Sequence, residues 1–85
     1  TQNLARYGAE YNIFVNSISP GIIETDLTRE ELKSGGGGLV VNLTLLKRPG
    51  VEKDVASIAL MLASDDQNYL TGQIISPNGG SYFTV

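Results

Sequence analysis

The chain has 85 residues, a net charge of −3, and neither cysteine nor histidine. This length allows one small domain at most, near the lower limit for burying an adequate core. The missing residue types exclude disulfides, thiolate and serine–histidine catalysis, and the usual zinc sites. The basic residues are scattered apart from Lys47-Arg48, and the longest apolar run, 58–63, is far too short to span a membrane. We therefore expect no nucleic-acid, membrane or metal partner, and the composition fits a cytoplasmic protein.

The first eighteen residues predict a helix followed by a strand. Residues 1–10 place Leu4, Ala5 and Ala9 on one side and end near Gly8, as in the last turns of a helix. The run 13–18 is rich in β-branched residues and too short for a helix, so it predicts a buried strand.

The strongest candidate for a binding site follows this strand. Pro20 fixes its φ angle and Gly21 relaxes the steric limits, which predicts a sharp turn. Ligands of parallel α/β sheets bind at the carboxyl ends of strands. Backbone amides beyond Gly21 and the hydroxyl of Thr25 would then be available to a ligand. An ordinary Pro-Gly turn explains the same residues equally well.

The next twenty residues are harder to interpret. Thr28-Arg29-Glu30-Glu31 matches the capping box and predicts a short helix that begins at Thr28 and ends before Gly35. The run Gly35–Gly38 predicts a mobile joint, which is a plain flexible loop, a functional hinge or an artefact. Residues 39–46 are apolar, and their pattern fits a short strand or a helix over a pocket.

The second half predicts one helix and one strand. Lys47-Arg48-Pro49-Gly50 is a break, and the helix 51–63 then begins with acidic residues in its first turn. Its apolar residues cover two opposite sides, so we expect it to lie between a sheet and a second partner: Val55, Ile58, Ala59 and Leu62 on one side, and Ala56, Leu60 and Ala63 on the other. A strand at 73–76 is stopped by Pro77. Two strands joined through helical material predict a right-handed crossover and a parallel sheet.

The order of these segments resembles the carboxyl-terminal third of a short-chain dehydrogenase/reductase. The segments that match, in the family's order and usual spacing, are 12–16, 19–26, 48–50, 53–56, 62–65, 69–73 and 78–80. The resemblance implies an α/β fold in which residues 1–85 form the carboxyl-terminal part of a doubly wound, Rossmann-type parallel sheet. Its last two strands would be 13–18 and 73–76, with flanking helices. It also implies hydride transfer between NAD or NADP and a small-molecule alcohol or carbonyl substrate.

The same resemblance assigns a cofactor-binding role to Pro20, Gly21, Ile22, Ile23 and Thr25. The backbone of Ile23 would contact the nicotinamide carboxamide, and Thr25 would bond the carboxamide or the pyrophosphate. The other three residues would shape the wall beside the ring. The carboxamide is the group by which a protein fixes the rotation of the nicotinamide ring.

Residues 26–46 resemble the family's substrate-binding loop, which closes over the active site as a lid. A loop packed on a neighbouring subunit is the alternative. Ile22, Leu27, Leu32 and 39–46 would line an apolar pocket suited to a hydrophobic or acyl-type carbonyl compound, although such residues also serve simply as core. In relatives, the helix matching 51–63 and the terminal strand pair across a two-fold axis, so we expect a homodimer or homotetramer.

The chain also departs from the family pattern. Asn78 stands where many relatives have aspartate, and four glycines are unusual inside the substrate loop. The glycine-rich phosphate loop, the catalytic serine and the Tyr-x-x-x-Lys pair have no match here, and we expect them upstream of residue 1. No catalytic residue is assigned, and the four tyrosines are interpreted as structural or exposed: Tyr7, Tyr11, Tyr69 and Tyr82.

Two functions remain open from the sequence. The first is a part of an NAD(P)-dependent oxidoreductase that contributes the nicotinamide-side loop, the substrate lid and an oligomer interface. The second is a non-catalytic oligomerisation or interaction module derived from such an enzyme.

Overall fold

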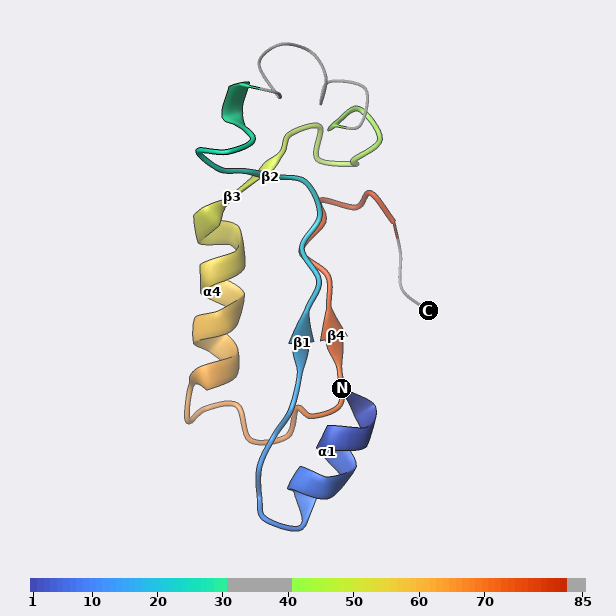
Figure 1. Cartoon of the computed structure of the whole chain (residues 1–85), viewed down its shortest axis with the longest axis vertical. Helices are drawn as coiled ribbons and strands as arrows, with labels where there is room; N and C mark the ends of the chain where they lie inside the picture. Colours follow the sequence, from blue (N-terminus) through green and yellow to red (C-terminus); the bar gives the residue numbers. More distant parts are fainter. Residues whose placement is uncertain (31–40, 83–85) are drawn as a thin grey trace.

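The computed structural model describes residues 1–30 and 41–82, which form a small α/β structure (Figure 1). The helices and strands that lie wholly within these ranges are α1 (Gln2–Ala9), β1 (Ser17–Ile18), β2 (Ile23–Glu24), β3 (Gly50–Val51), α4 (Glu52–Ala63) and β4 (Ile74–Ile75). The two longest of these elements, α1 and α4, are the two helices that hydrophobic periodicity predicts. In this part of the chain, no helix is long and apolar enough to cross a membrane.

The two predicted strands pair in parallel, as expected. β1 and β4 run side by side in Figure 1, with Ser17 opposite Ile74 and Ile18 opposite Ile75. The first strand is shorter than the predicted 13–18. Just before it, the amide of Val15 donates to the hydroxyl of Thr71 at 3.0 Å instead of to a backbone carbonyl, and Val15 accepts from the Gly72 amide at 2.7 Å. At Val15, a hydrogen bond to a side chain therefore takes the place of a backbone bond between the strands. Regular pairing begins only at Ser17.

A second parallel pair, β2 with β3, was not expected from the sequence. Ile23 lies opposite Gly50, and Glu24 lies opposite Val51. The sequence places Gly50 in a break, but this residue begins β3 and donates its amide to the Ile22 carbonyl at 2.8 Å. The break therefore ends at Pro49. This pair fixes the chain just after the predicted Pro-Gly turn.

The helices bury less surface than their patterns predict. In α1, Ala5 and Gly8 are buried while Leu4 is 64% exposed. α4 packs against β1, and Val55, Ile58 and Leu62 are half-buried, but the helix has no fully buried residue. Its other side is open, with Leu60 74% exposed. The predicted sheet-facing side is confirmed for Val55, Ile58 and Leu62, whereas Ala59 is exposed. Among the described residues, no second partner covers the opposite side.

The segment between β2 and β3 is only partly described. Arg29 and Glu30 are helical, in agreement with a helix that begins at Thr28. Glu31 and Gly35–Gly38 lie outside the described residues. Of the apolar run 39–46, residues 39 and 40 lie outside the described residues, Val41 is helical, and 42–46 form turns and bends. Neither a strand nor a helix is therefore correct for 42–46. The four tyrosines are exposed, as expected: Tyr7, Tyr11, Tyr69 and Tyr82.

Asp54 fixes the start of α4. Its Oδ2 accepts from the Val51 amide at 2.8 Å and from the Arg48 guanidinium at 3.2 Å. These contacts, the Val51 amide foremost and Arg48 next, lower the pKa of Asp54. The carboxylate therefore links the start of the helix to the segment that precedes β3.

The lowered pKa of Asp54 predicts a loss of stability in acid. A carboxyl with a depressed folded-state pKa stabilises the fold above its unfolded value, about 3.9, and this contribution is lost as the pH falls through the lower folded value. In the natively folded protein, we expect Asp54→Asn to lower the Tm at pH 7. At constant ionic strength, the Tm of this variant should then fall less steeply between about pH 5 and pH 3 than the Tm of the parent protein. Asp65→Asn, in an exposed turn, is the control. Equal acid profiles for Asp54→Asn and the parent protein would contradict the assignment.

Candidate functional site at the carboxyl ends of the strands

The predicted loop lies beside the segment that follows β4. The Ser19 amide donates to the Ile75 carbonyl at 2.8 Å, and the Gly21 amide donates to the Pro77 carbonyl at 3.1 Å. Residues 19–25 therefore leave the carboxyl end of β1 alongside residues 75–78. This is the edge of a parallel sheet at which ligands bind.

Gly21 is needed for a different reason than the sequence suggests. Its φ angle is not positive, so the turn itself does not require glycine. A Cβ atom at this position would lie 2.9 Å from the Asn78 Cα and 2.9 Å from the Asn78 Cβ. Close approach of the two backbone segments, and not a strained turn, therefore excludes a side chain here. Pro20, next to it, is exposed.

The backbone amide of Ile23 points away from β3. In the β2–β3 ladder, Gly50 donates to the carbonyl of Ile22, the residue before Ile23. Because successive residues of a strand direct their amides to opposite edges, the Ile23 amide faces the other edge of β2. Within residues 1–30 and 41–82, we find no acceptor for it. A ligand at this edge can therefore take its hydrogen bond.

The hydroxyl of Thr25 is half-buried and lies 3.2 Å from the hydroxyl of Thr28. The Thr28 oxygen also accepts from the Thr25 amide at 2.8 Å and donates to the Ile23 carbonyl at 2.9 Å. Sequence reasoning assigned Thr28 only to a helix cap and missed these bonds to the preceding loop. Both groups predicted to hold a carboxamide therefore belong to residues that Thr28 contacts.

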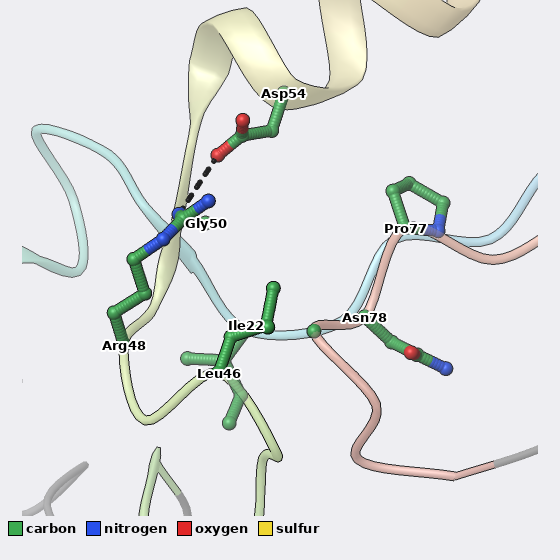
Figure 2. A pocket seen from close by; sticks show the side chains of 8 residues that line it. Ile22, Leu46, Arg48, Gly50, Asp54, Pro77 and Asn78 are labelled. Carbon is green, nitrogen blue, oxygen red and sulfur yellow. Dashed lines mark hydrogen bonds and ion pairs between the residues drawn. The ribbon is translucent and has the colours of Figure 1, made fainter.

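A cavity of about 210 Å³ opens next to this loop (Figure 2). Its lining comes from four segments: Ile22, Leu46, Arg48, Gly50, Asp54, Pro77, Asn78 and Gly79. Figure 2 shows the Arg48 guanidinium directed toward Asp54, with Ile22 and Leu46 between Arg48 and Asn78. Of the predicted cofactor residues, only Ile22 lines it. The contribution of Leu46 was predicted as part of an apolar wall, whereas that of Arg48 and Asn78 was not.

Arg29 holds the chain after β2 by two ion pairs. Its guanidinium lies 3.2 Å from Glu24 Oε1 and 2.9 Å from Asp26 Oδ1. These bonds, the one to Glu24 first, raise the pKa of Arg29 above its usual value. Because the groups are exposed, we assign the pairs a role in orienting the loop and not a large share of stability.

The turn after β4 fixes the far side of the cavity. The Asn78 Oδ1 accepts from the Gly80 amide at 2.9 Å, and its Nδ2 donates to the Tyr82 carbonyl at 3.0 Å. Aspartate at this position could not make the second bond, because an ionised carboxylate has no donor. The Gly79 carbonyl accepts from the amides of Leu45 and Leu46 at 2.9 and 3.1 Å. This turn therefore anchors the end of the predicted lid segment.

The cavity and the loop beside it hold backbone amides, hydroxyls, apolar side chains, and the ion pair between the Arg48 guanidinium and the Asp54 carboxylate. No group of three acidic residues suited to a metal ion is found in the described part of the chain. The arrangement is suited to binding and orienting an organic ligand by its polar substituents.

Residues 1–82 match the family model described as enoyl-(acyl carrier protein) reductase. The chain belongs to the short-chain dehydrogenase/reductase family. One relative, the 3-oxoacyl-[acyl-carrier-protein] reductase FabG of Salmonella typhimurium, is 38% identical over 82 residues. That match covers 96% of this chain and 33% of the relative, so the chain spans about a third of its length.

Solved reductases of this family have the same fold over the matched residues. YwfH, an NADPH dependent reductase involved in bacilysin biosynthesis, superposes with a TM-score of 0.88 at 31% identity, over 99% of this chain and 35% of that one. A 4-hydroxyisoleucine dehydrogenase mutant complexed with NADH and succinate gives a TM-score of 0.86 at 33% identity, over 95% of this chain and 34% of that one. The α/β class and the parallel pairing expected from the sequence are those of these relatives.

Proposed function

We propose that this chain is the nicotinamide-side part of an NAD(P)-dependent oxidoreductase that interconverts an alcohol and a carbonyl by hydride transfer. Residues 1–85 would form the last part of its Rossmann-type domain, and a longer cytoplasmic subunit would supply the catalytic serine, tyrosine and lysine. Support comes from the family membership and from relatives named as NADPH- and NADH-binding enzymes. The redox chemistry belongs to the bound nicotinamide, and these residues bind and orient it.

The observation that carries this proposal is a matched donor and acceptor on one short segment. A carboxamide offers one carbonyl acceptor and an NH₂ donor. The Ile23 amide is a donor without an acceptor in the described residues, and the Thr25 hydroxyl oxygen, two residues on, is an acceptor. Together they would bond both ends of the carboxamide and fix the rotation of the ring. Pro20, Gly21 and Ile22 would then form the wall beside it.

For the substrate, we propose a hydrophobic or acyl-type carbonyl compound. The cavity beside the loop has Ile22 and Leu46 in its wall, and the FabG relative is named for a 3-oxoacyl substrate. Residues 26–46 would act as the lid over this substrate, anchored at one end by the Gly79 carbonyl. The NAD or NADP preference depends on groups that bind the adenosine end.

The proposal is tested by substitutions at Thr25 in the full-length subunit. We expect Thr25→Val to raise the Kd for the reduced cofactor about 3- to 10-fold, the cost of one neutral hydrogen bond. Thr25→Ser keeps the hydroxyl and should retain most of the affinity. The Kd is measured by fluorescence titration with NADH and NADPH. Unchanged affinity for both cofactors in Thr25→Val would contradict a contact between Thr25 and the cofactor.

A second candidate function, an oligomerisation or interaction module, is favoured by exposed apolar side chains. Leu60 on α4 is 74% exposed and Ile74 on β4 is 55% exposed. These faces would also form the dimer or tetramer interface of the proposed enzyme. Cofactor titration of the full-length subunit separates the two functions: self-association without any NADH or NADPH binding would favour the module.

A further inference from the structure

Among the described residues, the hydroxyl of Thr28 takes part in three hydrogen bonds of 3.2 Å or less on the proposed cofactor loop. Its oxygen is 2.8 Å from the Thr25 amide, 3.2 Å from the Thr25 hydroxyl and 2.9 Å from the Ile23 carbonyl. The side chain is half-buried, and its partners are the two residues proposed to bind the carboxamide.

The direction of each proton in this cluster follows from the valence of a hydroxyl. Thr28 has one proton and two lone pairs. The Ile23 carbonyl can only accept, so the Thr28 proton goes to it at 2.9 Å in preference to the Thr25 carbonyl at 3.5 Å. The Thr25 amide can only donate and uses one Thr28 lone pair. Among the described residues, the Thr25 hydroxyl is the remaining partner, and the second lone pair accepts its proton.

The Thr25 hydroxyl is thereby left with its lone pairs facing outward and no proton to give. We infer that Thr28 is a positioning residue that fixes Thr25 as a hydrogen-bond acceptor and so makes the loop selective for a ring substituent that donates. This inference rests on the proposed function, because it assumes that Thr25 contacts the nicotinamide substituent. The NH₂ group of a carboxamide can donate a hydrogen bond to the Thr25 oxygen, whereas an acetyl group has no donor for it. The acetyl analogue would leave the Thr25 lone pairs unpaired, and the site discriminates against it.

The test uses the full-length subunit and two reduced cofactors that differ only in this substituent, NAD(P)H and its 3-acetylpyridine analogue. The quantity measured is the ratio of their Kd values. Thr28→Val removes the hydroxyl at nearly constant volume and frees the Thr25 proton to point outward. We expect it to reduce the preference for the carboxamide about 3- to 10-fold. Thr28→Ser should retain the preference.

The Thr25→Val variant and the variant that combines Thr25→Val with Thr28→Val complete a double-mutant cycle. Thr25→Val should reduce the preference by itself, and adding Thr28→Val should change it no further, because Thr28 acts only through Thr25. If Thr25→Val alters the preference but Thr28→Val does not, or if Thr28→Val weakens both cofactors equally, the inference is overturned while the proposed function stands. If Thr25→Val changes neither Kd, the proposed function itself fails. Should Thr28→Val not fold, Thr28→Ala with the same ratio measurement decides the question.

Discussion

Expressed by itself, the 85-residue chain is expected to show no cooperative thermal transition as a soluble monomer. Ordering a residue costs about 1.5 kcal/mol, which requires roughly 60 Å² of buried apolar area per residue at about 25 cal/mol per Å². Among the described residues, the buried ones are small or polar: Ala5, Gly8 and Thr44. No large side chain there is fully buried, and Leu27 is 94% exposed. Such a chain has too little core to offset its conformational entropy.

The measurement combines calorimetry, size-exclusion chromatography and amide hydrogen exchange on the isolated chain. We expect a broad heat-capacity trace, aggregation, and rapid exchange at the amides of β1 and β4. The full-length subunit is the control, and there the same amides should be protected because the rest of the sheet covers them. A sharp melt from a soluble monomer with protected β1 and β4 amides would contradict the expectation.

The elements that the sequence predicts well are those with a long or sharply bounded pattern. The helix α4 has four apolar residues at helical spacing and acidic residues in its first turn, and β4 is bounded by Gly72 and Pro77. The pair β2–β3 has no such signal, since each strand has two residues and Gly50 looks like part of a break. Tertiary pairing alone determines such strands.

In the candidate site too, the sequence predicts some features and not others. The sequence identifies the loop 20–25 because a proline and a glycine interrupt a β-branched run. It does not identify the reason for Gly21, because Asn78 is 57 positions further along the chain and their approach exists only in the fold. Thr28 fits a local cap motif, yet its described bonds run back to Ile23 and Thr25. Side-chain hydroxyls serve several local motifs equally well, so the sequence pattern does not choose among them.

In the full-length subunit, Gly80→Ala is expected to be far more damaging than Gly79→Ala, although both glycines have positive φ angles, +83° and +61°. A left-handed conformation costs an alanine about 1–2 kcal/mol at either position. At Gly79 the new Cβ would meet nothing closer than 3.6 Å, so this strain is the whole cost. At Gly80 it would lie 2.8–2.9 Å from three Leu45 atoms, including the Leu45 Cβ. Overpacking adds about 1–3 kcal/mol.

Rotation of the Leu45 side chain cannot relieve a clash with its Cβ, so the Leu45 backbone must move. That backbone donates its amide to the Gly79 carbonyl at 2.9 Å, the bond that anchors the end of the proposed lid. We therefore expect Gly80→Ala to raise the KM for substrate as well as to lower the Tm, and Gly79→Ala to lower the Tm alone. Each kcal/mol corresponds to about 2–4 °C in a subunit of 150–250 residues. Equal Tm losses in the two variants would show that the Leu45 backbone can shift without a cost in stability. The turn after β4 would then not hold the segment 44–46.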